Sequence, residues 1–242
     1  MKVLILGANS DVAEALASLL AQKKHELFLA GRSEEKLSAL KNDLEIRFEC
    51  KAHNLHFDAL DFDSHEQFYN SLPEKPDWVI CAFGLLFEQD QAEDNLKLAM
   101  QSYKVNFLGA VSIIDIIAKD FATRKSGVIV GISSVAGDRG RGSNYAYGSA
   151  KAGFSAYLSG LRNKLNTYGV HVLTVKPGFI KTKMTDHLKL PKLLTATPEQ
   201  VARKIEKAIR RKCNVIYVKW FWRYIMIVIK LIPEPIFKKL SL

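Results

Sequence analysis

The chain has 242 residues, of which 48% are hydrophobic, so it can bury the core of one α/β domain. Its three cysteines, Cys50, Cys81 and Cys213, have spacings that fit neither a disulfide framework nor a metal site, and they point to a reducing, cytosolic compartment. The net charge of +10 lies almost wholly in residues 201–242, where 11 Lys/Arg accompany 2 Asp/Glu, and the aromatic and aliphatic neighbours of these charges favour an anionic membrane over nucleic acid. The apolar run at the start of the chain is too short for a signal peptide.

Apolar runs alternate with helical patterns along the chain, as parallel βαβ units require. Strands are expected at Val3–Leu6, Glu26–Ala30, His56–Leu60, Trp78–Ala82, Val128–Ile132, Val170–Val175 and Val215–Val218. Helices are expected at about Asp11–Gln22, after an N-cap at Ser33, at Ala92–Phe121, at Asn144–Tyr168 and from Thr197 or Pro198. This order predicts an α/β fold, a single Rossmann-like doubly wound parallel sheet with helices on both faces, over residues 1–218. An amphipathic C-terminal tail follows over residues 219–242.

The first strand runs into a turn that opens the next helix. Gly7 permits the tight turn, and the N-terminus of the helix favours a pyrophosphate. Only the first glycine of a three-glycine pattern is present, so a plain strand–helix turn is the alternative. Asp11 would repel a pyrophosphate unless it caps the helix and points away. The residues expected to contact a dinucleotide here are Gly7, Asn9, Ser10, Asp11 and Val12.

The ends of the second and third strands bear on the choice of cofactor. Dinucleotide folds that prefer NAD place an acidic residue after the second strand, whereas this chain has Arg32. A guanidinium suits a 2′-phosphate, so NADP(H) is favoured over NAD(H); a solvated surface arginine is the alternative. Asp61, after the third expected strand, is assigned either to the adenine amine or to a helix cap.

Tyr147 and Lys151 are four residues apart on an expected helix and share one face. An ammonium beside the phenol lowers its pKa and makes the tyrosine a usable general acid or base. Ser134 lies thirteen positions before Tyr147, where a strand end can deliver its hydroxyl to the same carbonyl oxygen. These residues predict hydride transfer to or from a C–O carbon; an ordinary helix with Tyr147 packed and Lys151 solvated is the alternative.

Basic residues flank these groups. Arg139 and Arg141 lie between Ser134 and Tyr147 and could clamp a phosphate near the site. Four lysines follow the Pro-Gly pair at 177–178, namely Lys181, Lys183, Lys189 and Lys192. A solvated charged face is the alternative for both groups.

In this order, the glycine-containing turn, Asn106, Ser134, Tyr147-x-x-x-Lys151 and Pro177-Gly178 resemble the short-chain dehydrogenase/reductase family over essentially the whole chain. The resemblance implies that Ser134 binds the substrate carbonyl and Tyr147 donates the proton. It implies that Lys151 lowers the Tyr147 pKa and holds the nicotinamide ribose, and that Asn106 relays protons through water.

The resemblance also assigns cofactor contacts. Pro177, Gly178, Ile180 and Thr182 look like the loop that grips the nicotinamide carboxamide, and Tyr147 and Lys151 contact the cofactor as well as the substrate. Ala82 and Gly84 belong to a segment that departs from the family's Asn-Asn-Ala-Gly. No metal is expected.

A narrower resemblance is to the branch that reduces decaprenylphosphoryl 2-keto-ribose (the erythro-pentofuranosid-2-ulose). It is carried by residues 57–61, 82–86 and 147–153 and, in the tail, by residues 221–226, 232–233 and 236–240. This branch implies a ketone on a polyprenyl-phosphate lipid and a flavin-dependent oxidase partner that makes the ketone. Two alternatives stay open: a reductase of other apolar ketones, fatty or steroid-like, and a non-catalytic NADP-responsive partner of the oxidase.

The tail carries a basic stripe formed by Lys219, Arg223 and Lys230, with aromatic and aliphatic residues in the other directions of a helical wheel. A spanning helix needs ~20 apolar residues, and charges interrupt this run. Pro233 ends the helix. The tail is therefore expected to lie on an anionic membrane, which places a cytoplasmic protein at the inner face of the cell membrane. The alternative is that it packs on its own domain or closes a homo-oligomer, the assembly common in the family.

Overall fold

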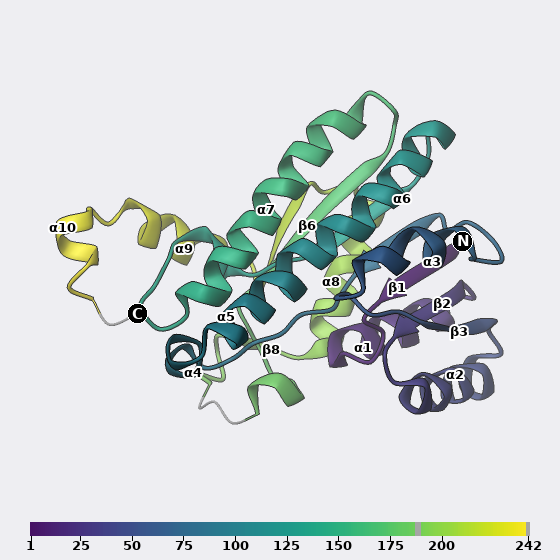
Figure 1. Ribbon diagram of the computed structural model, residues 1–242, viewed down its shortest axis with the longest axis horizontal. Coiled ribbons are helices and arrows are strands. Elements are labelled where there is room, and N and C mark those ends of the chain that lie inside the picture. Colours follow the sequence, from purple (N-terminus) through teal and green to yellow (C-terminus); the bar gives the residue numbers. More distant parts are fainter. Residues whose placement is uncertain (187–189, 241–242) are drawn as a thin grey trace.

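The computed structural model describes residues 1–186 and 190–240 (Figure 1). The strands of its main sheet are β1 Lys2–Leu6, β2 Glu26–Gly31, β3 Ala52–His56, β4 Trp78–Cys81, β5 Val128–Ile132, β6 His171–Pro177 and β9 Val215–Val218. All pairs are parallel, in the spatial order β3-β2-β1-β4-β5-β6-β9. The order reverses between β1 and β4, so the predicted doubly wound α/β fold is confirmed. A two-stranded sheet pairs β7 Phe179–Ile180 with β8 Thr195–Ala196.

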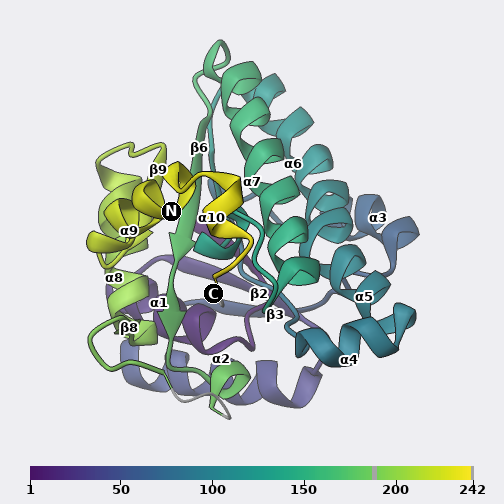
Figure 2. The same ribbon diagram turned by 90° about the vertical axis from the view of Figure 1, so that its left-hand side faces the viewer.

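Helices cover both faces of the sheet (Figure 2). One face is covered by α1 Asp11–Gln22, α2 Glu34–Phe48 and α8 Pro198–Arg210, and the other by α3 His65–Asn70, α6 Ala110–Arg124 and α7 Tyr145–Asn166. Successive side chains of a strand point to opposite faces of the sheet, so each strand contributes to both cores. In β1, Val3 and Ile5 belong to one core and Leu4 and Leu6 to the other, and all four are fully buried.

The prediction of a third strand at residues 56–60 is wrong, because β3 is Ala52–His56. This strand lies at the edge of the sheet and pairs only with β2, so it tolerates polar residues such as His53 and Asn54. The apolar residues that suggested a strand, Phe57 and Ala59, belong to the loop that follows β3 and are buried there.

The single helix expected at 92–121 is interrupted. It is divided into α4 Gln89–Asp94, α5 Leu96–Tyr103, a π-helical segment Lys104–Gly109 and α6. The Asn95 side chain accepts a hydrogen bond from the Lys97 amide (3.0 Å) and starts α5. The π segment carries Asn106, and single π turns inside α-helices are frequent at functional sites.

The tail forms two helices, α9 Phe221–Leu231 and α10 Glu234–Phe237 (Figure 1). Trp222 and Met226 of α9 are buried and pack against Val135. Within residues 1–186 and 190–240, no helix is long and apolar enough to cross a membrane. The division of the chain at residue 218 stays a prediction, but α9 packs on the domain that precedes it.

Candidate active site

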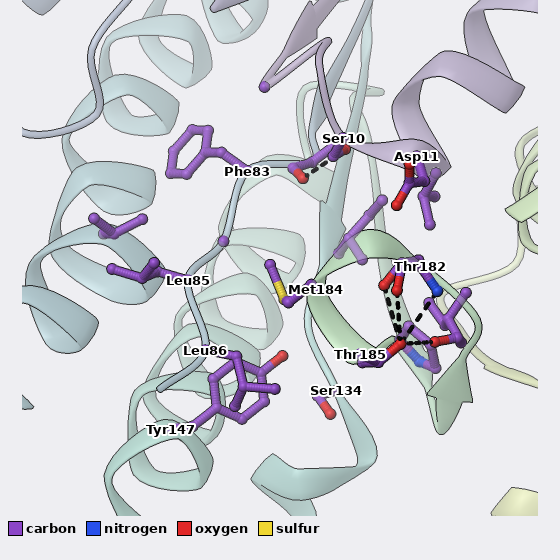
Figure 3. Close-up of a pocket in the computed structure, with 18 of the residues that line it drawn as sticks. Ser10, Asp11, Phe83, Leu85, Leu86, Ser134, Tyr147, Thr182, Met184 and Thr185 are labelled. Carbon is purple, nitrogen blue, oxygen red and sulfur yellow. Dashed lines mark hydrogen bonds between the residues drawn. The ribbon is translucent and has the colours of Figure 1, made fainter. Parts of the chain in front are cut away.

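The carboxyl ends of the central strands open into a cavity of about 610 Å³ (Figure 3). It lies at the switch point between β1 and β4, where doubly wound sheets bind ligands. The predicted site residues that line it are Gly7, Asn9, Ser10, Asp11, Val12, Arg32, Ala82, Gly84, Ser134, Tyr147, Lys151, Pro177, Gly178, Ile180 and Thr182. The structure therefore brings together residues that are up to 175 positions apart, from Gly7 to Thr182.

Asp61 does not line the cavity, and Asp58 does. The error follows from the third strand: β3 ends at His56, so the first carboxylate beyond it belongs to Asp58. That carboxylate also accepts a hydrogen bond from the Leu60 amide (3.0 Å), which fixes the loop. Asp58, and not Asp61, is therefore the acid of this segment that lies at the cavity, and its contact with an adenine amine stays a prediction.

The β1–α1 turn has the shape of a dinucleotide cradle. Gly7 has φ +84°, and a Cβ there would lie 2.6 Å from the Phe83 amide nitrogen, so only glycine fits. Ser10 caps α1 through the Ala13 amide (3.3 Å). The side-chain nitrogen of Asn9 is buried, with no partner among the residues that the structure describes. A close backbone approach and an unused donor both fit a bound dinucleotide.

Asp11 is not the helix cap that the sequence suggested. Its carboxylate accepts a hydrogen bond from the Lys183 amide (2.7 Å) and lies 3.5 Å from the Lys183 ammonium. This contact ties the β1–α1 turn to the segment after the Pro-Gly pair and compensates the charge that would otherwise repel a pyrophosphate.

The loop after β6 is braced from within and from the tail. The Thr185 hydroxyl donates to the Ile180 carbonyl (2.6 Å) and lies 3.2 Å from the Thr182 hydroxyl (Figure 3). A Cβ on Gly178 would lie 2.0 Å from the Trp222 ring, so α9 packs directly on this loop. Trp222 also donates its indole N–H to the Leu194 carbonyl (3.1 Å).

Ser134 and Tyr147 approach the cavity from two elements, the end of β5 and the first turns of α7 (Figure 3). The Ser134 hydroxyl oxygen accepts a hydrogen bond from the Ala136 amide (3.1 Å), which holds it at the strand end. Lys151 lies one turn beyond Tyr147, with its ammonium 5.7 Å from the centroid of the phenol ring. It donates to the Ile132 carbonyl (3.2 Å).

Burial dominates the electrostatics of these groups. It raises the pKa of Tyr147 to about 12, although the Ser134 hydroxyl acts in the opposite direction. It also lowers the pKa of Lys151 to about 8, with an opposing contribution from the Cys81 thiol. The expected lowering of the Tyr147 pKa is not met, because burial outweighs the other contributions, and the Lys151 ammonium bonds a backbone carbonyl and not the phenol oxygen. Tyr147 is thus a neutral phenol at pH 7, the form that donates a proton.

Asn106 lies behind the cavity and does not line it. Its amide nitrogen donates to the carbonyls of Leu85 (2.6 Å) and Ser102 (3.0 Å), and its oxygen accepts from the Leu85 amide (3.0 Å). A Cβ on Gly84 would lie 3.1 Å from the Asn106 oxygen and 3.5 Å from the Lys151 nitrogen, so the two side chains meet across Gly84. Asn106 fixes the strand-four loop beside Lys151; its proton relay stays a prediction.

The two arginines between Ser134 and Tyr147 have different surroundings. Arg139 donates to the carbonyls of Ile229 (2.5 Å) and Ile232 (2.7 Å), pairs with Glu234 and lies over the Phe237 ring. It fastens the tail, so the predicted phosphate clamp cannot use it. Arg141 lines the cavity.

The sequence did not identify the apolar wall of the cavity. That wall is formed by Phe83, Leu85, Leu86, Val135, Phe179, Met184 and Trp222. A signal existed for Trp222, because it lies four residues before Met226 and the two form one apolar face among the basic residues of the tail. Of the four lysines after the Pro-Gly pair, Lys183 lines the cavity and Lys189 lies outside the described residues.

Comparisons with known proteins agree on the class of this site. The family model described as short chain dehydrogenase matches residues 1–192. An uncharacterised oxidoreductase of Mycobacterium tuberculosis is 32% identical over 241 residues, covering 98% of this chain and 96% of the relative. That match takes in most of the tail.

Two further comparisons bear on chemistry and fold. A 3-oxoacyl-[acyl-carrier-protein] reductase of Rickettsia bellii is 30% identical over 218 residues, covering 84% of this chain and 86% of the relative. The solved structure of a short-chain dehydrogenase from Sphingobium yanoikuyae in complex with NADPH superposes with a TM-score of 0.81. It is 20% identical and covers 96% of each chain, which supports the shared fold.

Proposed function

This chain belongs to the short-chain dehydrogenase family, and from that premise we propose that it reduces a 2-keto sugar carried on a polyprenyl phosphate, using NADPH. The coarser activity follows from the family: the chain is an NAD(P)-dependent oxidoreductase of the ketoreductase kind. The proposal concerns the substrate, the preferred cofactor and the place where they meet.

The chain's own residues can bind the carbonyl group and donate the proton that ketone reduction needs. Bound NADPH supplies the hydride. Ser134 hydrogen-bonds the carbonyl oxygen, and Tyr147 gives its proton to that oxygen as negative charge develops. The Lys151 ammonium, 5.7 Å from the centroid of the phenol ring, would turn from the Ile132 carbonyl to the phenolate once that proton has left. A phenol that keeps its proton at pH 7 suits reduction, because oxidation of an alcohol would need the phenolate at the start.

The pKa of Lys151, about 8, predicts the pH dependence of reduction. Tyr147 keeps its proton below its pKa of about 12, so the acid itself is not lost. As the pH rises through the pKa of Lys151, the ammonium that stabilises the phenolate is lost. We expect kcat/KM to be independent of pH below the pKa of Lys151 and to fall about tenfold per pH unit above that pKa. A Lys151→Met variant should lack this falling limb; a wild-type profile that stays flat up to pH ~10 would contradict the assignment.

The position of α9 is the observation that supports a lipid-linked substrate. Its inner face, with Trp222, forms a wall of the cavity. Its outer face, which we define as Val228, Leu231 and the N-cap residue Trp220, is exposed by 63%, 76% and 70%, respectively. Exposed apolar residues beside basic ones are the pattern of a helix that lies in a membrane interface. We propose that the outer face rests on an anionic membrane at its cytoplasmic side, where the cavity would receive a substrate from the bilayer.

NADPH is proposed over NADH because Arg32 lines the cofactor end of the cavity and its side chain is exposed there. The neighbouring end of β2 carries no acidic residue to accept the ribose hydroxyls. The ketone itself would come from oxidation of the sugar alcohol, a reaction that a flavin-dependent oxidase partner would perform.

A second candidate is the reduction of other apolar ketones, fatty or steroid-like. The apolar cavity wall and the likeness to the Rickettsia bellii reductase favour it. The two functions differ in whether a sugar and a phosphate are needed for turnover.

The test is a panel of three ketones, each assayed with NADPH and with NADH. We expect kcat/KM to be highest for a farnesyl-phosphoryl 2-keto-pentose with NADPH, and at least about tenfold lower for a 3-oxoacyl thioester, for a steroid ketone and for the preferred ketone with NADH. A preference for either apolar ketone would replace the proposed substrate with the second candidate, and equal use of NADH would reject the cofactor assignment.

A further inference from the structure

We propose that Arg141, together with Asn144, binds the phosphate group of the substrate inside the catalytic cavity. This inference rests on the proposed reduction of a phosphate-bearing ketone and assigns the residues that would recognise its anionic group. Both residues line the cavity and belong to the loop between the two catalytic hydroxyl groups, Ser134 and Tyr147. A ligand held there can reach both hydroxyls.

Arg141 carries donors that the protein does not use. Its side chain is half-buried, and its Nε is buried with no hydrogen-bond partner among residues 1–186 and 190–240. Burial lowers the pKa of Arg141, with the charge of Asp138 acting in the opposite direction, yet a guanidinium remains charged at any physiological pH. A buried donor without a partner costs free energy, and a ligand that accepts a hydrogen bond from the Nε would offset that cost.

Two acids that could compensate Arg141, Asp138 and Asp11, are engaged elsewhere. Asp138, the acid whose charge acts on Arg141, accepts a hydrogen bond from the Tyr217 hydroxyl (2.7 Å) and pairs with Lys176. Asp11 is paired with Lys183 on the cofactor side of the cavity. Arg139, two positions before Arg141, donates to two carbonyls and one carboxylate of the tail. The two arginines of this loop therefore differ, because the Arg141 Nε has no such partner in the described part of the chain.

Asn144 strengthens the site. Its side-chain oxygen is also buried and has no partner in the described part of the chain, so its amide can turn to present its N–H₂ group to a ligand. Asn144 directly precedes α7, a helix of 22 residues whose N-terminal end favours negative charge. A guanidinium fork, an amide and a helix end together suit the oxygens of a phosphate ester.

The surroundings define the rest of the ligand. Apolar side chains, including Leu86, Met184 and Trp222, share the cavity with Arg141. A free inorganic phosphate would leave the apolar side chains without a partner. An alkyl phosphate ester would contact the apolar side chains with its alkyl chain and Arg141 and Asn144 with its phosphate. The ligand class is therefore an amphiphilic phosphate ester that also bears the ketone.

The proposal is tested by calorimetric titration of the NADPH-loaded, full-length protein with farnesyl phosphate, farnesol and inorganic phosphate. We expect Arg141→Gln to raise the Kd for farnesyl phosphate at least about tenfold and to leave the Kd for farnesol and for NADPH unchanged within about twofold. Arg141→Lys should lose part of the affinity, because a point charge replaces the fork. Arg203→Gln, which removes an exposed charge from α8, is the matched control and should change nothing.

In the Arg141→Gln variant, an unchanged Kd for farnesyl phosphate, an equal loss of affinity for farnesol, or a raised Kd for NADPH would overturn the site. Inorganic phosphate that binds as tightly as farnesyl phosphate would also reject it, since the apolar wall would then contribute nothing. If the keto sugar is not turned over while farnesyl phosphate still needs Arg141, the proposed substrate fails and this site remains. If turnover holds and the Kd does not depend on Arg141, the site alone fails.

Discussion

Replacing Tyr147 by Phe is expected to lower kcat for ketone reduction by about 10²–10⁴-fold, the usual contribution of a positioned general acid. The variant keeps the ring in its half-buried place on α7, at the wall of the cavity, and removes only the proton donor. Because Lys151 and the cradle at Gly7 are untouched, the Kd for NADPH should stay within about twofold of the wild-type value. Stopped-flow measurement of NADPH oxidation, with NADPH binding followed by fluorescence, separates the two effects.

Tyr145 provides the matched control, since it lies two residues earlier and its exposed hydroxyl donates to Glu93 (3.0 Å) outside the cavity. Tyr145→Phe should reduce ketones at the wild-type rate. Wild-type turnover in Tyr147→Phe, or equal losses in both variants, would remove Tyr147 from its assigned role.

The second large effect is expected at the outer face of α9. Substitution of Trp220, Val228 and Leu231 by Ser should weaken binding to vesicles that contain phosphatidylglycerol at least about 100-fold, because three side chains lose their apolar burial. Co-sedimentation with vesicles measures the change. Reduction of a water-soluble ketone should not change, since these residues do not line the cavity.

Deletion of residues 219–242 is the less informative variant, because it would also remove Trp222 from the cavity wall. The matched control is Ile46→Ser on α2, which alters an apolar side chain that is 81% exposed far along the chain from the tail. Vesicle binding that survives the triple substitution, or that falls equally in Ile46→Ser, would show that the outer face of α9 is not a membrane surface.

Most of the fold could be predicted from the sequence because six of the seven main strands are apolar runs between helical patterns. The last, β9 Val215–Val218, was placed at its observed bounds. The strand prediction failed at β3, where the position of the strand at the sheet edge decides its pattern of polar and apolar residues. The edge strand β3 has one partner and polar residues, so its sequence resembles a loop. The π-helical segment at Asn106 leaves no mark on the hydrophobic period, because it adds a single wide turn inside an otherwise helical run.

The candidate site was predictable as far as local motifs reach. Tyr147, Lys151 and Ser134 are set by spacing on a helix and by a strand end, and the structure places them in one cavity. The roles of Arg139 and Arg141 could not be separated, because which one meets the tail depends on how α9 packs. The direction of the Tyr147 pKa shift could not be predicted either. The spacing shows that a lysine is near, but it shows neither how deeply the phenol is buried nor which oxygen the ammonium binds.

The proposed substrate of this ketoreductase is a lipid-linked, phosphate-bearing sugar ketone. The most direct measurement is a competition in which the protein, bound to vesicles, receives equal amounts of a farnesyl-phosphoryl 2-keto-pentose, a 3-oxoacyl thioester and a steroid ketone with NADPH deuterated at the transferred position. Mass spectrometry then locates the deuterium in the alcohols formed. The account predicts that the label appears predominantly at the former carbonyl carbon of the sugar. Label found only in the hydroxyacyl or steroid product would contradict it.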